Sequence, residues 1–209
     1  ASGRLEAART SLHEALALWR GRAFEGFEDV ESLRAQAAQL EERRLVTLER
    51  RIDADLYAGA AAELVVELAD LAAQHPYREH EAHALSHLCD ALILMDRLEE
   101  AGEQVEVFGR LCRDVSHVET RINMLSRRTQ LHSATGDAAS ALASATEAIE
   151  AARPTGDPML IGVALLALGT ADAHLGRHDD AVAHHREAHE LAEGIGQRYS
   201  AGEALIALA

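Results

Sequence analysis

Histidine is the residue whose spacing in this 209-residue chain most directly suggests chemistry, because imidazole is a common zinc ligand. His80, His83 and His87 share one face of an expected helix, and His185 and His189 lie four residues apart. Neither group has the His-Glu-x-x-His order of a hydrolytic zinc helix, and no supporting carboxylate is evident. We therefore expect no metal and no cofactor, and elemental analysis would test this expectation.

Catalysis is not indicated by any pattern in the chain. The sequence lacks a Gly-rich phosphate loop and a serine elbow, and its acids are spread along expected solvated helix faces. Cys89 and Cys112 lie in apolar helical patterns typical of core thiols in a reducing compartment. No apolar run is long enough to cross a membrane. We expect a cytoplasmic binding protein that is not an enzyme and does not contact membranes.

Polar residues on the helices expected to line a concave wall are the candidate binding site. Asn123, Ser126 and Gln130 recur at i, i+3 and i+7 with Arg127 beside them. Such a stripe can hydrogen-bond an extended peptide backbone or a carboxylate. The neighbouring repeats add further polar positions to this wall: His83, Ser86, Asp90, Thr170 and His174. A wet, unoccupied groove is the alternative interpretation.

A 40-residue repeat is the feature that would position these residues. Asp96, Gly136 and Gly176 recur in step, and each is followed five residues later by an alanine. Gly supplies a left-handed turn, and a small residue lets two helices approach to roughly 8–10 Å. The repeat predicts an all-α, right-handed array of helical hairpins.

The apolar spacing places the helices of this array. We expect them near residues 5–19, 31–57, 61–74, 77–94, 98–113, 118–134, 138–153, 158–175, 179–194 and from 198 onward. Asp29 is the expected N-cap of the longest helix, and Trp19, Phe24 and Phe27 are expected apolar anchors before it. Asp157-Pro158 predicts another helix start.

The net charge of −15 limits the kind of partner, since 35 acidic residues face 20 basic ones. Every basic residue is arginine, which is typical of a GC-rich genome. An acidic surface repels a phosphate backbone and favours basic protein partners. Direct DNA binding by these residues is not expected.

Two stretches resemble known families. Residues 12–21 read LHEALALWRG and residues 75–79 read HPYRE. Together with Arg43-Arg44-Leu45 and Glu63-Leu64, they resemble the bacterial transcriptional activator domain of the Streptomyces antibiotic regulatory protein family. From about residue 118 onward, the segments LGRHDDA and HREA resemble tetratricopeptide repeats of large actinobacterial regulators. Residues 110–116 read RLCRDVS and depart from the Glu-Leu-Gly-x-x-Pro type of segment that normally closes the activator domain.

The resemblance implies a domain division and a function. Residues 1–113 would form the activator domain, and residues 114–209 the repeats, with the last hairpin truncated. The chain would be the interaction module of a transcriptional activator that reads DNA only through a winged helix outside these residues. The implied partners are an RNA polymerase subunit, a sister protomer in a homodimer, or a signalling peptide. The alternative is the repeat arm of a large ATP-dependent signalling regulator.

Overall fold

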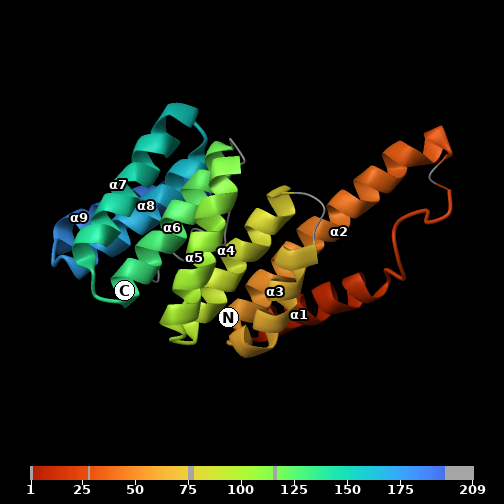
Figure 1. The fold of residues 1–209 in the computed structure, drawn as a ribbon, viewed down its shortest axis with the longest axis horizontal. Coiled ribbons are helices and arrows are strands. Elements are labelled where there is room, and N and C mark those ends of the chain that lie inside the picture. The colour runs from red at the N-terminus through yellow and green to blue at the C-terminus, as the bar shows by residue number, and fades with distance from the viewer. Residues whose placement is uncertain (1, 28, 75–77, 115–116, 196–209) are drawn as a thin grey trace. The chain divides into compact units, whose positions relative to one another are not determined.

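The fold is all-helical within residues 2–27, 29–74, 78–114 and 117–195, which are the residues that the computed structural model describes. The expectation of an all-α array of helical hairpins is confirmed (Figure 1). The helices are α1 (Ser2–Ala17), α2 (Glu31–Tyr57), α3 (Ala61–Gln74), α4 (Arg78–Leu94), α5 (Leu98–Asp114), α6 (Val118–Ala134), α7 (Ala138–Ala152), α8 (Pro158–His174) and α9 (His178–Gly194). The helix expected from residue 198 and the truncated hairpin lie outside the described residues.

The chain forms two compact units, residues 1–64 and residues 65–209. In the first unit α1 packs against α2, which at 1.5 Å per residue is about 40 Å long. In the second unit the pairs α4–α5, α6–α7 and α8–α9 pack as successive hairpins. The predicted division after residue 113 stays a prediction.

The same turn closes each hairpin of the second unit. Asp96, Gly136 and Gly176 adopt left-handed φ angles of 57°, 79° and 73°. The residue after each donates its N–H to the carbonyl five positions earlier, at 2.9, 2.8 and 2.9 Å, which is the Schellman pattern. Gly59, with φ 83°, repeats this turn between α2 and α3. The sequence repeat therefore reports one recurring backbone geometry.

Small residues allow the paired helices to approach closely, as the repeat predicts. Ala101, Ala141 and Ala181 are buried in the hairpin interiors. Gly169 shows the closest approach, because a Cβ atom there would lie 2.4 Å from Nε2 of His185 on α9. Only a residue without a side chain fits between α8 and this imidazole.

Side chains from successive hairpins share one core in the second unit. Leu85 of α4, Phe108 of α5, Ile122 and Leu125 of α6 and Leu165 of α8 are each at most 1% exposed. α6 lies between its neighbours, since it contacts α4, α5, α7 and α8. The residues of α6 are consequently held in place from both directions along the array.

The connection between α1 and α2 differs from the prediction. Val30, which makes no side-chain cap, occupies the N-cap position of α2 in place of Asp29. Trp19 is half-buried, whereas Phe24 and Phe27 are 37% and 59% exposed and do not act as core anchors. The reason is local, because residues 18–27, 29 and 30 form turns and bends without regular structure and are mostly exposed.

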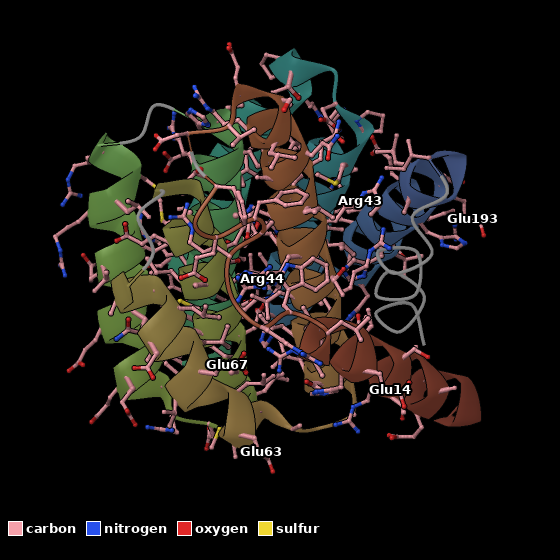
Figure 2. The ribbon with its side chains drawn as sticks, turned by 90° about the vertical axis from the view of Figure 1, so that its right-hand side faces the viewer. Glu14, Arg43, Arg44, Glu63, Glu67 and Glu193 are labelled. Carbon is pink, nitrogen blue, oxygen red and sulfur yellow. The ribbon has the colours of Figure 1, made fainter. Side chains whose placement is uncertain are left out.

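The long helix α2 carries many charges on its solvent side. Figure 2 shows Arg43 and Arg44 on α2 and Glu14 on α1. Glu41 of α2 accepts a 2.7 Å hydrogen bond from the Ala23 N–H, which fastens the preceding loop to the helix. Its other carboxylate oxygen lies 3.5 Å from Arg44, a surface pair of small energetic value.

Candidate functional site

The first helices of the three hairpins, α4, α6 and α8, stand side by side in the second unit, because α6 contacts both α4 and α8. We call the polar residues predicted on these helices the wall. Their backbone placement follows from the hairpin repeat, since equivalent positions on successive first helices face the same way. The wall is therefore a property of the array and not of a single helix.

Arg127 of α6 joins two of these helices. Its Nε donates to the Ser86 hydroxyl at 3.1 Å, and its Nη1 donates to the Asp90 carboxylate, both on α4. Nη1 also donates to Oε1 of Gln130 at 3.0 Å, one turn further along α6. Four of the predicted residues thus form one network across residues that are 37 and 41 positions apart in sequence.

The Arg127–Asp90 pair is the electrostatic centre of the wall. The side chains of Arg127 and Asp90 are 18% and 20% exposed, so water screens them little. Burial raises the pKa of Asp90, and the Arg127 charge and hydrogen bond oppose that rise. A neutralised cation at this position makes the wall polar without a net local charge.

The remaining α6 residues of the wall are less satisfied. Asn123 is half-buried and Ser126 is 3% exposed, and Ser133, which lies two turns beyond Ser126 on the same helix, is 5% exposed. Neither seryl oxygen has a hydrogen-bond partner in the described structure, in contrast to Thr129, whose hydroxyl donates to the Leu125 carbonyl at 2.9 Å. A buried hydroxyl without a partner costs about 1–3 kcal/mol.

Three predicted wall residues stand apart from this network. His83 of α4 lies 4.0 Å from the Glu119 carboxylate of α6. The Thr170 hydroxyl donates to the Leu166 carbonyl of its own helix at 2.9 Å, and His174 is exposed in the last turn of α8. The described residues show no polar contact between Thr170 or His174 and Arg127.

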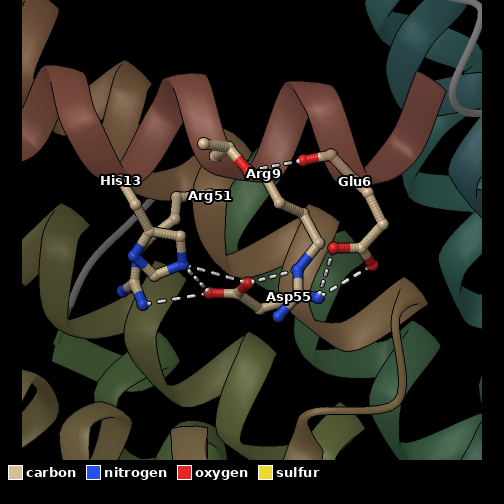
Figure 3. A network of polar contacts seen from close by, with 6 residues as sticks. Glu6, Arg9, His13, Arg51 and Asp55 are labelled. Carbon is tan, nitrogen blue, oxygen red and sulfur yellow. Dashed lines mark hydrogen bonds and ion pairs between the residues drawn. The ribbon is translucent and has the colours of Figure 1, made fainter. Parts of the chain in front are cut away.

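A second polar network, in the first unit, was not foreseen. Asp55 of α2 is 3% exposed and accepts hydrogen bonds from Arg9 Nε at 2.8 Å and from Arg51 at 3.2 Å (Figure 3). His13 Nε2 lies 3.1 Å from the same carboxylate. Glu6 completes the set by accepting from Arg9 at 3.0 Å. This network connects α1 to the buried end of α2.

Opposing influences set the pKa of Asp55. Burial by itself raises this pKa, but hydrogen bonds from Arg9 and His13 and the charges of His13 and Arg51 lower it below its usual value. The carboxylate therefore stays ionised in the folded protein and balances the buried Arg51. The arrangement is suited to holding two helices together.

One sequence signal could have found this network. Asp55 interrupts the apolar stripe of α2 between Ile52 and Leu56, and an acid in a buried stripe calls for a basic partner. Arg51, one turn before Asp55, is such a partner, because it is itself only 6% exposed.

The histidines do not gather into a metal site within the described residues, which hold no group of three or more potential metal ligands. The side chain of His80 lies outside the described part of the structure. His185 is instead packed over Gly169, and His184 lies 3.0 Å from the buried Asp172 carboxylate. In the same described ranges no helix is both long and apolar enough to span a membrane.

Comparison with known proteins places one family on the N-terminal half. Residues 1–114, more than half of the chain, match the family model of the bacterial transcriptional activator domain. The regulatory protein DnrI of Streptomyces peucetius is 40% identical over 78 residues, which cover 37% of this chain and 29% of DnrI.

Two further relatives are regulators as well. The transcriptional regulatory protein EmbR of Mycobacterium tuberculosis is 32% identical over 101 residues, which cover 48% of this chain and 25% of EmbR. The regulatory protein AfsR of Streptomyces coelicolor is 37% identical over 108 residues, which cover 52% of this chain and 10% of AfsR. The chain thus spans less than a third of the length of these relatives.

Proposed function

Because the chain belongs to the bacterial transcriptional activator domain family, we propose that it is the regulatory, protein-binding part of a transcriptional activator. The names of the matched relatives, all of them regulators, support this proposal. The module would work by binding without catalysis, in the cytoplasm, while a winged helix outside these residues reads DNA. The tetratricopeptide nature of the repeats after residue 114 belongs to the same proposal.

The wall is the surface that we propose for the partner. The observation that carries this assignment is the Arg127 network, in which Ser86, Asp90 and Gln130 fix the guanidinium between two helices. A surface that is already ordered loses little conformational entropy on binding, which raises affinity. A groove that only water fills would not require the Arg127 guanidinium to be held in one position.

The charges of the wall favour a peptide backbone over a carboxylate as the group bound. Asp90 already neutralises Arg127, so a ligand carboxylate would compete with an internal one. Asn123 makes no hydrogen bond to another described residue, and Gln130 uses only its carbonyl oxygen inside the network. Side-chain amides can both donate to and accept from an extended chain. The candidate partners are an RNA polymerase subunit, a sister protomer or a signalling peptide.

A binding experiment with defined partners tests this proposal. Immobilised wild-type chain is exposed in turn to Streptomyces RNA polymerase holoenzyme, to a pool of extended peptides and to a second copy of the chain. We expect retention of at least one partner, and a loss of about tenfold in its affinity for Asn123→Ala/Gln130→Ala, equivalent to about 1.4 kcal/mol.

The matched control is Gln104→Ala, which removes a half-buried amide from α5, outside the wall. This variant should bind like the wild type. Equal affinity of the wild type and the double variant for every partner would reject the wall as the site. Absence of binding in all three arms would reject the protein-binding function itself.

A further inference from the structure

A local concentration of positive charge lies within an acidic unit. Residues 65–209 carry 11 arginines and 23 acidic residues, a formal net charge of −12. Within this unit, Arg110 and Arg113 lie near the end of α5, and Arg121 and Arg128 lie on α6. We call these four residues the arginine cluster. Arg110, Arg113 and Arg121 are exposed, and Arg128 is half-buried.

Helix geometry and packing bring the cluster together. Arg110 and Arg113 are one turn apart on α5, and Arg121 and Arg128 are two turns apart on α6, which α5 contacts. The guanidinium of Arg128 lies over the α5 backbone at Gly109, where an added Cβ would be 3.3 Å from its Nη2. A glycine at this place lets the cation rest against α5.

The thiol of Cys112 lies among the same charges. Cys112 is half-buried on α5, and its Sγ is 3.6 Å from the Thr120 carbonyl of α6. Burial raises the pKa of Cys112 to about 11, while the positive charges of Arg128, Arg121 and Arg113 oppose this rise. The charges of three arginines from two helices therefore act on one thiol at the α5–α6 contact.

Three of the four arginines in the cluster form no ion pair with a described side chain. Elsewhere in the described unit four arginines pair with carboxylates, whereas the exposed Arg186 of α9 does not: Arg97 pairs with Glu100, Arg127 with Asp90, Arg153 with Glu187 and Arg177 with Asp172. In the cluster Arg121 pairs with Glu147 at 2.5 Å, whereas the described side chains offer no ion pair to Arg110, Arg113 or Arg128. Gathered like charges repel, and a bound anion removes that repulsion.

We propose that the arginine cluster is a docking surface for an acidic segment of a partner protein. Guanidinium groups bind carboxylates through paired hydrogen bonds, and the three that have no ion pair within the described residues suit a short run of Asp or Glu side chains. A short acidic segment meets mainly the local charge, because fields are screened beyond about 10 Å at 0.1 M salt. A long nucleic acid would also meet the surrounding charge of −12, which disfavours it.

This surface is separate from the wall. Arg128 and Gln130 are two residues apart on α6, which places them about 200° apart around the helix axis. The two surfaces therefore face different directions, and a partner on one leaves the other accessible. The inference does not depend on what the wall binds.

Fluorescence anisotropy of a labelled decaglutamate peptide, titrated with the 209-residue chain at about 50 mM salt, tests the proposal. We expect saturable binding that weakens as salt is raised. Arg113→Ala/Arg128→Ala should lower the affinity at least about tenfold, as expected for the loss of two charge-assisted contacts. Arg186→Ala is the matched control, because it removes an exposed arginine from α9, and it should leave the affinity unchanged within about twofold.

Three results would overturn the proposal: no binding of decaglutamate above a neutral decapeptide, equal losses in the cluster variant and in Arg186→Ala, or tighter binding of a ten-nucleotide single strand of DNA. If circular dichroism shows that the double variant is unfolded, Arg110→Ala/Arg113→Ala replaces it, because both side chains are exposed. Retained binding by Asn123→Ala/Gln130→Ala is expected and separates this test from that of the wall.

Discussion

Replacing Asp55 by Asn tests whether a buried carboxylate holds α1 against α2. Asp55→Asn keeps the shape of the side chain but removes its charge, so Arg51, whose side chain is 8% exposed, would lose its buried counter-ion. Breaking a buried pair costs about 3–5 kcal/mol. Arg9 and His13 are 25% and 52% exposed and can turn to water, so we expect about 3 kcal/mol at pH 7.

Urea unfolding followed by tryptophan fluorescence is the appropriate assay. Trp19 is the single tryptophan of the chain and lies in the first unit, so its signal reports the unit that contains Asp55. Glu42→Gln provides the control, since it removes an exposed carboxylate from the same helix and should change the free energy of unfolding by less than about 0.5 kcal/mol.

The effect of pH gives a second, independent readout. The pKa of Asp55 is lowered in the folded state, so the unfolded chain takes up this proton first as the pH falls. The stabilisation by Asp55 is complete above the unfolded value of about 3.9 and is lost as the pH falls through the lower folded value. The difference between the wild type and Asp55→Asn should therefore shrink below about pH 4. A difference under about 1 kcal/mol at pH 7, or one that does not change with pH, would refute the network as a stabilising element.

Glycine geometry leads to two further predictions, both measurable as changes in the unfolding free energy. Gly169→Ala should destabilise the protein by about 1–3 kcal/mol, because the new Cβ would overlap the His185 ring. Gly162→Ala on the same helix should be neutral or stabilising by up to about 1 kcal/mol, because its nearest atom lies at 3.9 Å. Equal effects of the two substitutions would contradict the close approach of α8 and α9. Asp96→Gly should stabilise the protein by about 0.5–1 kcal/mol, because glycine adopts a positive φ without strain. Gly136→Ala should destabilise it by about 1–2 kcal/mol, and because the space around Gly136 is open, backbone strain is the only expected cost. A stabilising effect of Gly136→Ala would show that the turn is not conserved in solution.

Helix positions were largely predictable from the sequence, and the reason is periodicity. α2, α3 and α6 begin and end at the predicted residues, because each has regular apolar spacing and a glycine turn at one of its ends. The signal at Asp157 also holds, since its side chain accepts the Met159 N–H at 2.8 Å. The irregular segment before α2 has no such period, so the exposure of Phe27 and the cap at Val30 were missed.

The wall was predictable only as far as the repeat reaches. The 40-residue frame aligns Asp90 with Gln130 and so brings Ser86, Asp90 and Arg127 to one surface. It does not reveal that Arg127 is neutralised, because that depends on the rotamers of side chains on two helices. The Asp55 network joins residues 42 and 46 positions apart outside the repeat, and no period relates them.

The resemblance to the activator domain is confirmed by the family match, whereas the role of each wall residue stays a prediction. Fold and family follow from patterns that many residues share. A binding role depends on a few side chains, and the sequence of this chain does not reveal the partner protein that they would contact.

The recurrence of one turn at residues 59, 96, 136 and 176 has a consequence for how such a chain can change over time. In the second unit the described hairpins touch only their immediate neighbours. Duplicating or deleting one whole hairpin would then change only the contacts with the hairpins on either side of it and leave the other hairpins unchanged. Proteins built in this way can become longer or shorter in steps of about 40 residues, while the packing angles between the retained hairpins stay the same.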